Sequence, residues 1–210
     1  MKIIQSFLKH RPSRDYIVNE TNLAWLQLSM PVPVEQILAE FSRVSNLVVD
    51  HRSEDRYSNL SNVGWKSLTL HGVSHDVTTA SNATHTWTDI AERCPVTVGW
   101  LKEHFEIDST TGRIRFMILE PGGYILPHQD RDQQGLREIN IAITNPAGCT
   151  FRFLDRGIIP FEPGTAFIID TSKRHFVINN SNQSRLHMIV HSTLKPGIIE
   201  QSYADCFYNQ

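Results

Sequence analysis

The chain contains few cysteines. Its 210 residues include three, Cys94, Cys149 and Cys206, which lie far apart and form no CxxC pair. An odd number of scattered cysteines argues against a disulfide framework and against a zinc–thiolate site. We therefore expect reduced structural thiols, as in a cytoplasmic protein.

Long runs of one residue type are also missing. No apolar stretch approaches the ~18 residues of a membrane span, and the N-terminal MKIIQSFLKH lacks the features of a signal peptide. The 20 Lys and Arg residues face 22 Asp and Glu, giving a net charge of -2 without a basic run. A membrane protein and a nucleic-acid-binding protein are therefore poor hypotheses.

No internal repeat, low-complexity tract or Gly/Ser linker divides the chain. A mass of 24.0 kDa suits one domain with a full hydrophobic core, so we expect a single domain over 1–210. Its character changes along the chain. Residues 1–110 mix strands with helices, residues 111–195 read as a β-core, and residues 196–210 form a C-terminal tail.

Two helices are predicted in the first part. One follows Pro33, where apolar residues recur at three- and four-residue steps over 35–41, and the other follows Pro95 and covers 96–105. The runs 23–28 and 65–70 resemble strands. The polar segment 71–86 is rich in Ser, Thr, Asn and His, which predicts a loop that could cover a site.

From Gly112 onward, short strands follow one another closely. They are predicted at 113–119, 136–144, 149–154, 165–169, 175–179 and 185–193, with turn residues between them. Closely spaced short strands without intervening helices favour a sandwich or barrel. The predicted fold is mainly β (α+β), a jelly-roll, cupin-like core with the N-terminal helices packed on it.

The most informative motif is His128-Gln129-Asp130. On an extended chain, residues two apart point to the same face, so this imidazole and this carboxylate can hold one metal ion together. The best candidate for a third ligand is His175, at the start of a predicted strand. Two histidines and one carboxylate with open positions opposite are typical of non-haem iron(II) oxygenases.

Arg185 stands ten residues after His175, at the start of the next predicted strand. A 2-oxoglutarate co-substrate needs a cation for its distal carboxylate, and a guanidinium matches a carboxylate with two parallel hydrogen bonds. Strand alternation places Arg185, His187, Ile189 and His191 on one face. If Arg185 faces the barrel interior, we expect His187 near the co-substrate as well.

The segment 114–193 resembles the aspartyl/asparaginyl β-hydroxylase family, which includes bacterial proline hydroxylases. The resemblance covers about two thirds of the chain, with the Trp65 strand included. It is carried by Glu120-Pro121-Gly122-Gly123, Pro127-His128-Gln129-Asp130, Leu136-Arg137, Pro146-Ala147-Gly148-Cys149, Phe161-Glu162-Pro163-Gly164, Asp170, His175, Asn179-Asn180-Ser181 and Arg185.

This resemblance implies a double-stranded β-helix, iron(II), 2-oxoglutarate and O2, with succinate and CO2 released beside a hydroxylated product. By the match of motifs, His128, Asp130 and His175 would be the metal ligands, and Arg185 would pair with the distal carboxylate. Arg137 and Asn140 are further candidates for co-substrate contacts. Asn140 stands where several family members carry a histidine, and an asparagine can also donate a hydrogen bond to a carboxylate.

The substrate implied is an aliphatic carbon of an amino acid, a peptidyl side chain or a related small metabolite. Trp65, Arg115 and Tyr124 could line its pocket, although core packing and surface roles are at least as common for such residues. Two other functions stay open. The jelly roll could be a cupin-like metal enzyme that does not use 2-oxoglutarate, or a binding module that has lost catalysis. The sequence does not predict the oligomeric state.

Overall fold

The computed structural model describes residues 12–51, 62–78 and 83–208. Its longest strand is β6 (Ile114–His128), which runs through both halves of the β-core. The strand bends at Pro121-Gly122-Gly123, where Gly122 has a φ of 74° and a Cβ on Gly123 would lie 2.8 Å from the carbonyl oxygen of Glu120. Glycine at these positions therefore allows one strand to serve two sheets.

The first half of β6 belongs to the larger sheet, where Leu119 pairs with Arg185 and Ile114 with Val190 of the antiparallel β12 (Arg185–Val190). The order continues through β7 (Glu138–Thr144) and β10 (Ala166–Ile169) to β1 (Trp25–Leu28). On the other side of β6 lies β3 (Asn62–Gly72), which also pairs with the short strands β2 (Val49–Asp50) and β4 (Thr86–Trp87).

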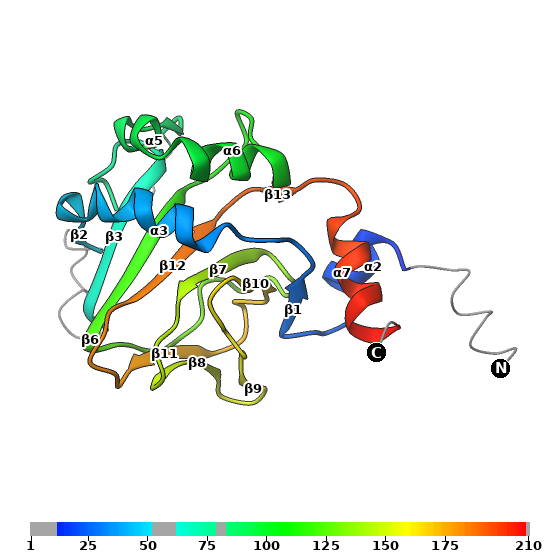
Figure 1. Ribbon diagram of the computed structural model, residues 1–210. Coiled ribbons are helices and arrows are strands. Elements are labelled where there is room, and N and C mark those ends of the chain that lie inside the picture. The colour runs from blue at the N-terminus through cyan, green and yellow to red at the C-terminus, as the bar shows by residue number, and fades with distance from the viewer. Residues whose placement is uncertain (1–11, 52–61, 79–82, 209–210) are drawn as a thin grey trace, which may run out of the picture.

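The second half of β6 pairs with β11 (His175–Asn179), which continues to β8 (Cys149–Phe153) and β9 (Gly157–Ile158). A separate pair joins β5 (Phe105–Glu106) to β13 (Thr193–Leu194). Through the bent β6, the strands other than β5 and β13 form one continuous antiparallel sheet. Its two halves, the larger sheet with β7, β10 and β12 and the smaller sheet with β8, β9 and β11, face each other across a shared apolar cluster. This topology is the predicted double-stranded β-helix (Figure 1).

The described helices lie on the outer side of the larger sheet. α3 (Val34–Ser42), α5 (Asp89–Arg93) and α6 (Pro95–His104) lie along one side of the molecule, and α2 (Arg14–Asn19) and α7 (Ile198–Phe207) pack together beside β1 (Figure 1). A 3-10 turn (Ser45–Leu47) follows α3. None of the described helices has the length and apolar character needed to cross a membrane.

Two apolar clusters follow from strand alternation. Leu186, Met188 and Val190 of β12 face the helices in the larger cluster. The opposite face of the same sheet contributes Leu119 to the cluster between the two sheets, with Phe151 and Phe153 from β8. The alternation predicted for 185–191 is therefore confirmed, because odd-numbered residues of β12 point between the sheets.

The strand predictions are confirmed, with shifts at the ends. β11 begins and ends at the predicted residues, whereas β6 extends past 119 to His128 because the bend keeps it paired. The two predicted helices correspond to α3 and α6. The predicted tail 196–210 contains the helix α7, and the described part of 71–86 has strand only at its two ends, Gly72 and Thr86.

Candidate metal and co-substrate site

His128 and His175 are brought together by strand pairing. His128 ends β6, His175 begins β11, and the two residues are direct partners in the antiparallel register. Directly opposed residues share a face of the sheet, and here the two ring centroids lie 4.4 Å apart. The two histidines, 47 residues apart in the sequence, are therefore in contact in the fold.

Asp130 completes the group from the loop after β6. Its backbone N–H donates to the carbonyl of Thr171 at 3.0 Å, which fixes the loop against the turn between β10 and β11. Oδ1 lies 3.4 Å from Nε2 of His128, and Oδ2 lies 3.7 Å from Nε2 of His175. One ligand atom from each of the three residues lies within 4.8 Å of the others.

The main chain orients both imidazoles. Nδ1 of His128 lies 2.8 Å from the carbonyl oxygen of Leu126, and Nδ1 of His175 lies 2.9 Å from that of Lys173. A carbonyl only accepts, so each Nδ1 carries the proton and each Nε2 presents a lone pair toward the carboxylate. This donor set fits a divalent metal ion that binds nitrogen and oxygen ligands, such as iron(II).

The three ligands differ in burial. His175 is 3% exposed and stacks on Phe151, with ring centroids 5.0 Å apart and an interplanar angle of 8°. Burial lowers the pKa of His175, so the ring is neutral near neutral pH, as a metal ligand must be. The side chains of His128 and Asp130 are 31% and 38% exposed. The metal group is therefore closed on the side of His175 and open on the other.

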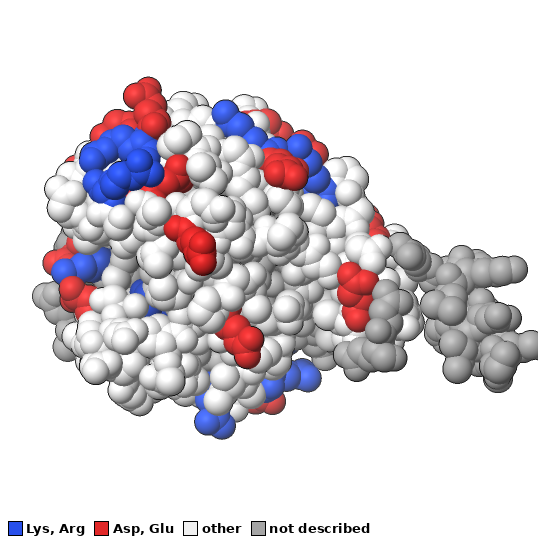
Figure 2. Space-filling model, in the orientation of Figure 1, with Lys and Arg blue, Asp and Glu red and all other residues white. Residues whose placement is uncertain are grey.

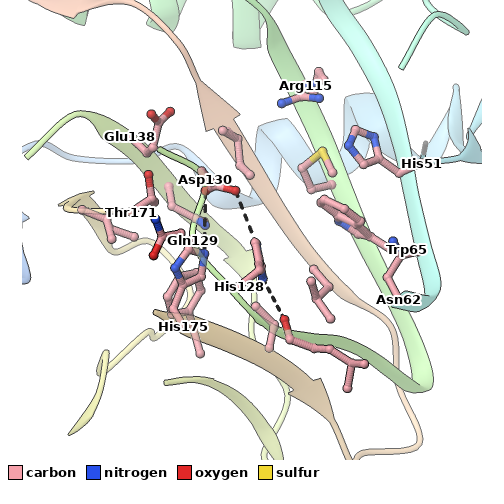
Figure 3. Close-up of a pocket in the computed structure, with 18 of the residues that line it drawn as sticks. His51, Asn62, Trp65, Arg115, His128, Gln129, Asp130, Glu138, Thr171 and His175 are labelled. Atoms are coloured by element: carbon pink, nitrogen blue, oxygen red, sulfur yellow. Dashed lines mark hydrogen bonds and ion pairs between the residues drawn. The ribbon is translucent and has the colours of Figure 1, made fainter. Parts of the chain in front are cut away.

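The open side faces a pocket of about 520 Å³. Figure 3 shows His128, Asp130 and His175 on one wall, with Trp65 and His51 on β3 and its flank across from them. The pocket floor is the inner face of the larger sheet, to which β6, β7 and β12 contribute residues. Its size lies within the usual range for small-molecule pockets, roughly 300–1,000 Å³.

Arg185 lies in the same pocket and is 5% exposed. Its guanidinium packs over the ring of Phe161 at 5.8 Å, and Nη2 donates to Nδ1 of His187 at 2.8 Å. Burial lowers the pKa of Arg185 to about 10, so the group remains charged at neutral pH. Its Nε has no hydrogen-bond partner within the described ranges, although it is buried. A buried cation with a donor to spare suits a carboxylate ligand.

His187 supports Arg185 from behind the pocket. Asn145 Nδ2 donates to the carbonyl of Phe161 at 3.0 Å, which leaves its Oδ1 facing His187 Nε2 at 3.3 Å. The imidazole therefore donates from Nε2 and accepts the Arg185 N–H at Nδ1. Burial, and then the charge of Arg185, lowers the pKa of His187 far below its usual value, so the ring is neutral.

Asn140 also reaches this network, with its side-chain oxygen placed 2.7 Å from Nδ1 of His187. Since Nδ1 accepts from Arg185 and carries no proton, it cannot donate to this oxygen. A favourable contact requires the NH2 end of Asn140 to be turned toward Nδ1, where it shares the single lone pair with Arg185. Asn140 lines the pocket, and its contact with the co-substrate stays a prediction. Sequence reasoning missed Asn145, which reads as a turn residue in Asn145-Pro146 and offers no other signal.

Arg137 lies elsewhere than the sequence suggested. Its guanidinium donates to Oδ1 of Asn19 beside α2 at 2.6 Å, and the residue is not part of the pocket wall. The reason is the alternation of β7, which directs Glu138 and Asn140 into the pocket and their neighbours away from it. Among the substrate-pocket candidates, Trp65 and Arg115 line the pocket and Tyr124 does not.

The comparisons with known proteins agree with this geometry. The model of the family described as Aspartyl/Asparaginyl beta-hydroxylase matches residues 33–193. A search of curated proteins finds no significant match. Among solved structures, a prolyl-4-hydroxylase from Pseudomonas putida is 14% identical, with 85% of this chain and 95% of that chain covered and a TM-score of 0.51.

A second similar structure is an oxidoreductase of the 2OG-Fe(II) oxygenase family from Burkholderia pseudomallei. It is 12% identical, with 82% of this chain and 85% of that chain covered and a TM-score of 0.52. At these identities, the two structures support the fold.

Proposed function

Because this chain belongs to the aspartyl/asparaginyl β-hydroxylase family, we propose that it hydroxylates an aliphatic carbon of an amino acid, a peptidyl side chain or a related small metabolite, releasing succinate and CO2. The family is one of Fe(II)- and 2-oxoglutarate-dependent hydroxylases. The observation that carries the proposal is one pocket with two imidazole Nε2 atoms aimed at the Asp130 carboxylate and a buried guanidinium nearby.

In this proposal, His128, Asp130 and His175 hold iron(II), and Arg185 binds the distal carboxylate of 2-oxoglutarate. The bound iron, with O2, couples oxidative decarboxylation of the 2-oxo acid to oxidation of a substrate C–H bond. The names of the two similar structures, a prolyl-4-hydroxylase and a 2OG-Fe(II) oxygenase, support the same class of reaction.

The protein's own residues provide orientation and exclusion of water. The carbonyls of Leu126 and Lys173 keep both Nε2 lone pairs directed at the ion, so no side chain has to reorganise when the metal binds. Phe151 covers the buried side of His175. The neutral His187 accepts from Arg185 without competing for its charge, which leaves that charge for the co-substrate.

The experiment that tests this function uses anaerobic protein with added iron(II) and 2-oxoglutarate. We expect a weak visible charge-transfer band, which arises when a 2-oxo acid chelates iron(II). Absence of the band in folded, iron-loaded protein would contradict the proposal. Succinate formation upon admission of air is the second readout.

Arg185→Ala separates this function from that of a cupin-like metal enzyme that needs no 2-oxo acid. We expect the apparent KM for 2-oxoglutarate to rise about 100-fold, because a bidentate charge-assisted contact is lost, while iron still binds. Arg152→Gln on the exposed side of β8 is the matched control and should behave as wild type. An unchanged KM in Arg185→Ala would favour the cupin-like function.

A further inference from the structure

A second group of charged side chains lies in the same pocket, apart from Arg185 and from the metal ligands. It comprises Arg113 and Arg115 from β6 and its approach, Arg131 from the loop after Asp130, Glu138 from β7 and His191 after β12. In Figure 3, Arg115 and Glu138 flank Asp130 on opposite sides. The proposed co-substrate and metal sites do not use this group, called here the distal arginine cluster.

The strand register separates the distal arginine cluster from Arg185. Arg115 pairs with Ile189, whereas Arg185 pairs with Leu119, so the two arginines are four residue steps apart along the same face of the sheet. At a strand rise of about 3.3 Å per residue, that spacing is roughly 13 Å. The pocket floor therefore offers two places for anions, one beside each arginine.

The cluster carries an excess of positive charge. Arg131 Nη2 lies 2.8 Å from Oε1 of Glu138, and His191 Nε2 lies 3.3 Å from its Oε2. Burial, with Arg115 and Arg113, lowers the pKa of His191 to about 3, so this ring adds no charge at neutral pH. The neighbouring Asp130 also acts on Glu138 and His191. Three guanidinium groups therefore face two carboxylates, and the remaining positive charge favours a further anion.

Both arginines are held in place at the pocket. Arg113 donates from Nη1 to the carbonyl of Thr78 at 2.5 Å, and Arg115 is 5% exposed. Beside them, Met117 of β6 and Trp65 of β3 give the pocket an apolar wall. A carboxylate joined to a short hydrocarbon matches both features.

We infer that Arg113 and Arg115 bind a carboxylate of the primary substrate, which is therefore a small aliphatic acid such as a free amino acid, and not a residue within a peptide chain. The hydrocarbon part packs against Trp65 and Met117, between the arginines and the metal ligands. This inference rests on the proposed hydroxylase function and narrows its substrate class.

The first experiment compares acids with their amides. Succinate formation by the iron-loaded enzyme is measured with the free amino acids and unsubstituted aliphatic acids, each beside its carboxamide. We expect at least one acid to stimulate turnover, with its carboxamide at least about ten-fold weaker in kcat/KM, since the charge-assisted pair is lost. Equal stimulation by acid and amide, stimulation only by internal peptide residues, or no stimulation by any acid would each overturn the inference.

The second experiment uses Arg115→Gln, with Arg115→Lys as the conservative variant and Arg152→Gln as the exposed control on β8. For the stimulating acid, we expect KM to rise about ten-fold or more in Arg115→Gln and less in Arg115→Lys, with KM for 2-oxoglutarate changed less than about two-fold. An unchanged KM for the acid in Arg115→Gln would overturn the inference. If Arg115→Gln does not fold, Arg113→Gln takes its place.

A readout without turnover completes the test. The stimulating acid should raise the Tm of the metal-free wild-type protein more than its carboxamide does, at matched ionic strength, and this difference should vanish in Arg115→Gln. A difference of the same size in that variant would contradict the inference. The Fe(II) and 2-oxoglutarate band tests the proposed function separately, so a protein that shows the band and fails these tests loses only the inference.

Discussion

The two ends of the pocket are built in different ways. At the metal end, the carbonyls of Leu126 and Lys173 orient the histidines, so the main chain determines where each Nε2 points. At the other end, Arg185 is oriented by His187, which is held in turn by Asn145. That arrangement runs through two successive side chains, and the main chain enters it only at the carbonyl of Phe161, which accepts from Asn145.

This difference has a consequence for tolerance to substitution. A carbonyl remains in place whichever residue carries it, so the orientation of the metal ligands is insensitive to neighbouring side chains. A buried side-chain network fails when one member is removed, because its partners are left unsatisfied. We therefore expect that substitutions of residues next to the site residues weaken 2-oxoglutarate binding much more than iron binding.

The largest effect is expected for Asp130→Ala. Removing a proposed metal ligand should lower the iron(II) affinity by more than about 100-fold and should abolish succinate formation. This loss exceeds the one expected when a residue that only hydrogen-bonds to a ligand is replaced. The exposed Asp132→Ala is the matched control two residues away and should bind iron as wild type does. Metal titration of the metal-free protein measures both, and wild-type affinity in Asp130→Ala would remove Asp130 from the site.

A smaller effect is expected for Asn145→Ala. Without the Asn145 oxygen that accepts from Nε2, His187 can rotate or change tautomer. Because His187 orients Arg185, KM for 2-oxoglutarate should rise about ten-fold. Iron affinity should stay within about two-fold of wild type. Leu126→Ala is the counterpart at the metal end, where only a side chain changes and the carbonyl on His128 remains. If Leu126→Ala weakened iron binding as strongly as Asn145→Ala weakens 2-oxoglutarate binding, the contrast between the two ends would be wrong.

The smallest effect is a pH dependence of stability. The pKa of His187 is low in the folded protein, so between that pKa and the ordinary value near 6.5 the unfolded chain binds a proton that the folded chain does not. The stabilisation is present above pH 6.5 and declines as pH falls below it, by up to about 1.4 kcal/mol per pH unit for one group.

His187→Gln isolates this contribution, because glutamine can still accept from Arg185 but does not titrate. Urea unfolding of metal-free protein at pH 7.5, 6.5 and 5.5 measures the free energy of unfolding. This free energy should decline less steeply with falling pH in the variant, and the difference in slope should correspond to about one bound proton. Identical slopes in the two proteins would mean that His187 is accessible to protonation in the folded state. Since His175 is also buried and neutral, part of the slope should remain in the variant.

Much of the fold was predictable from local pattern. The strand 175–179 and the helices that follow Pro33 and Pro95 appear where periodicity and turn residues indicate them. The bend that lets β6 continue to His128 could not be predicted, because Pro121-Gly122-Gly123 is equally typical of the end of a strand. The helix α7 was also missed, because its stability comes from packing beside α2 and β1, which the local sequence does not show.

The candidate site divides in the same way. The spacing of His128 and Asp130 and the start of a strand at His175 predict from the sequence a group that the fold brings together, because strand alternation is a local property. Arg137 lies outside the pocket and Asn145 was not predicted, so the sequence did not show where either side chain would lie. Whether a residue next to a strand faces the pocket or the outside depends on the register of that strand with its neighbours, which the sequence of one segment does not contain.

Sequence alone determined the chemical inventory of this protein: two imidazoles, a carboxylate and a strand-borne arginine in a β-rich segment, with the alternation that sets which of them share a face. The tertiary structure decided which of these groups meet. Strands distant in the chain pair His128 with His175 and keep His187 neutral. They also assemble the distal arginine cluster around Glu138. Such contacts arise from sheet register and burial, and those are properties of the whole fold.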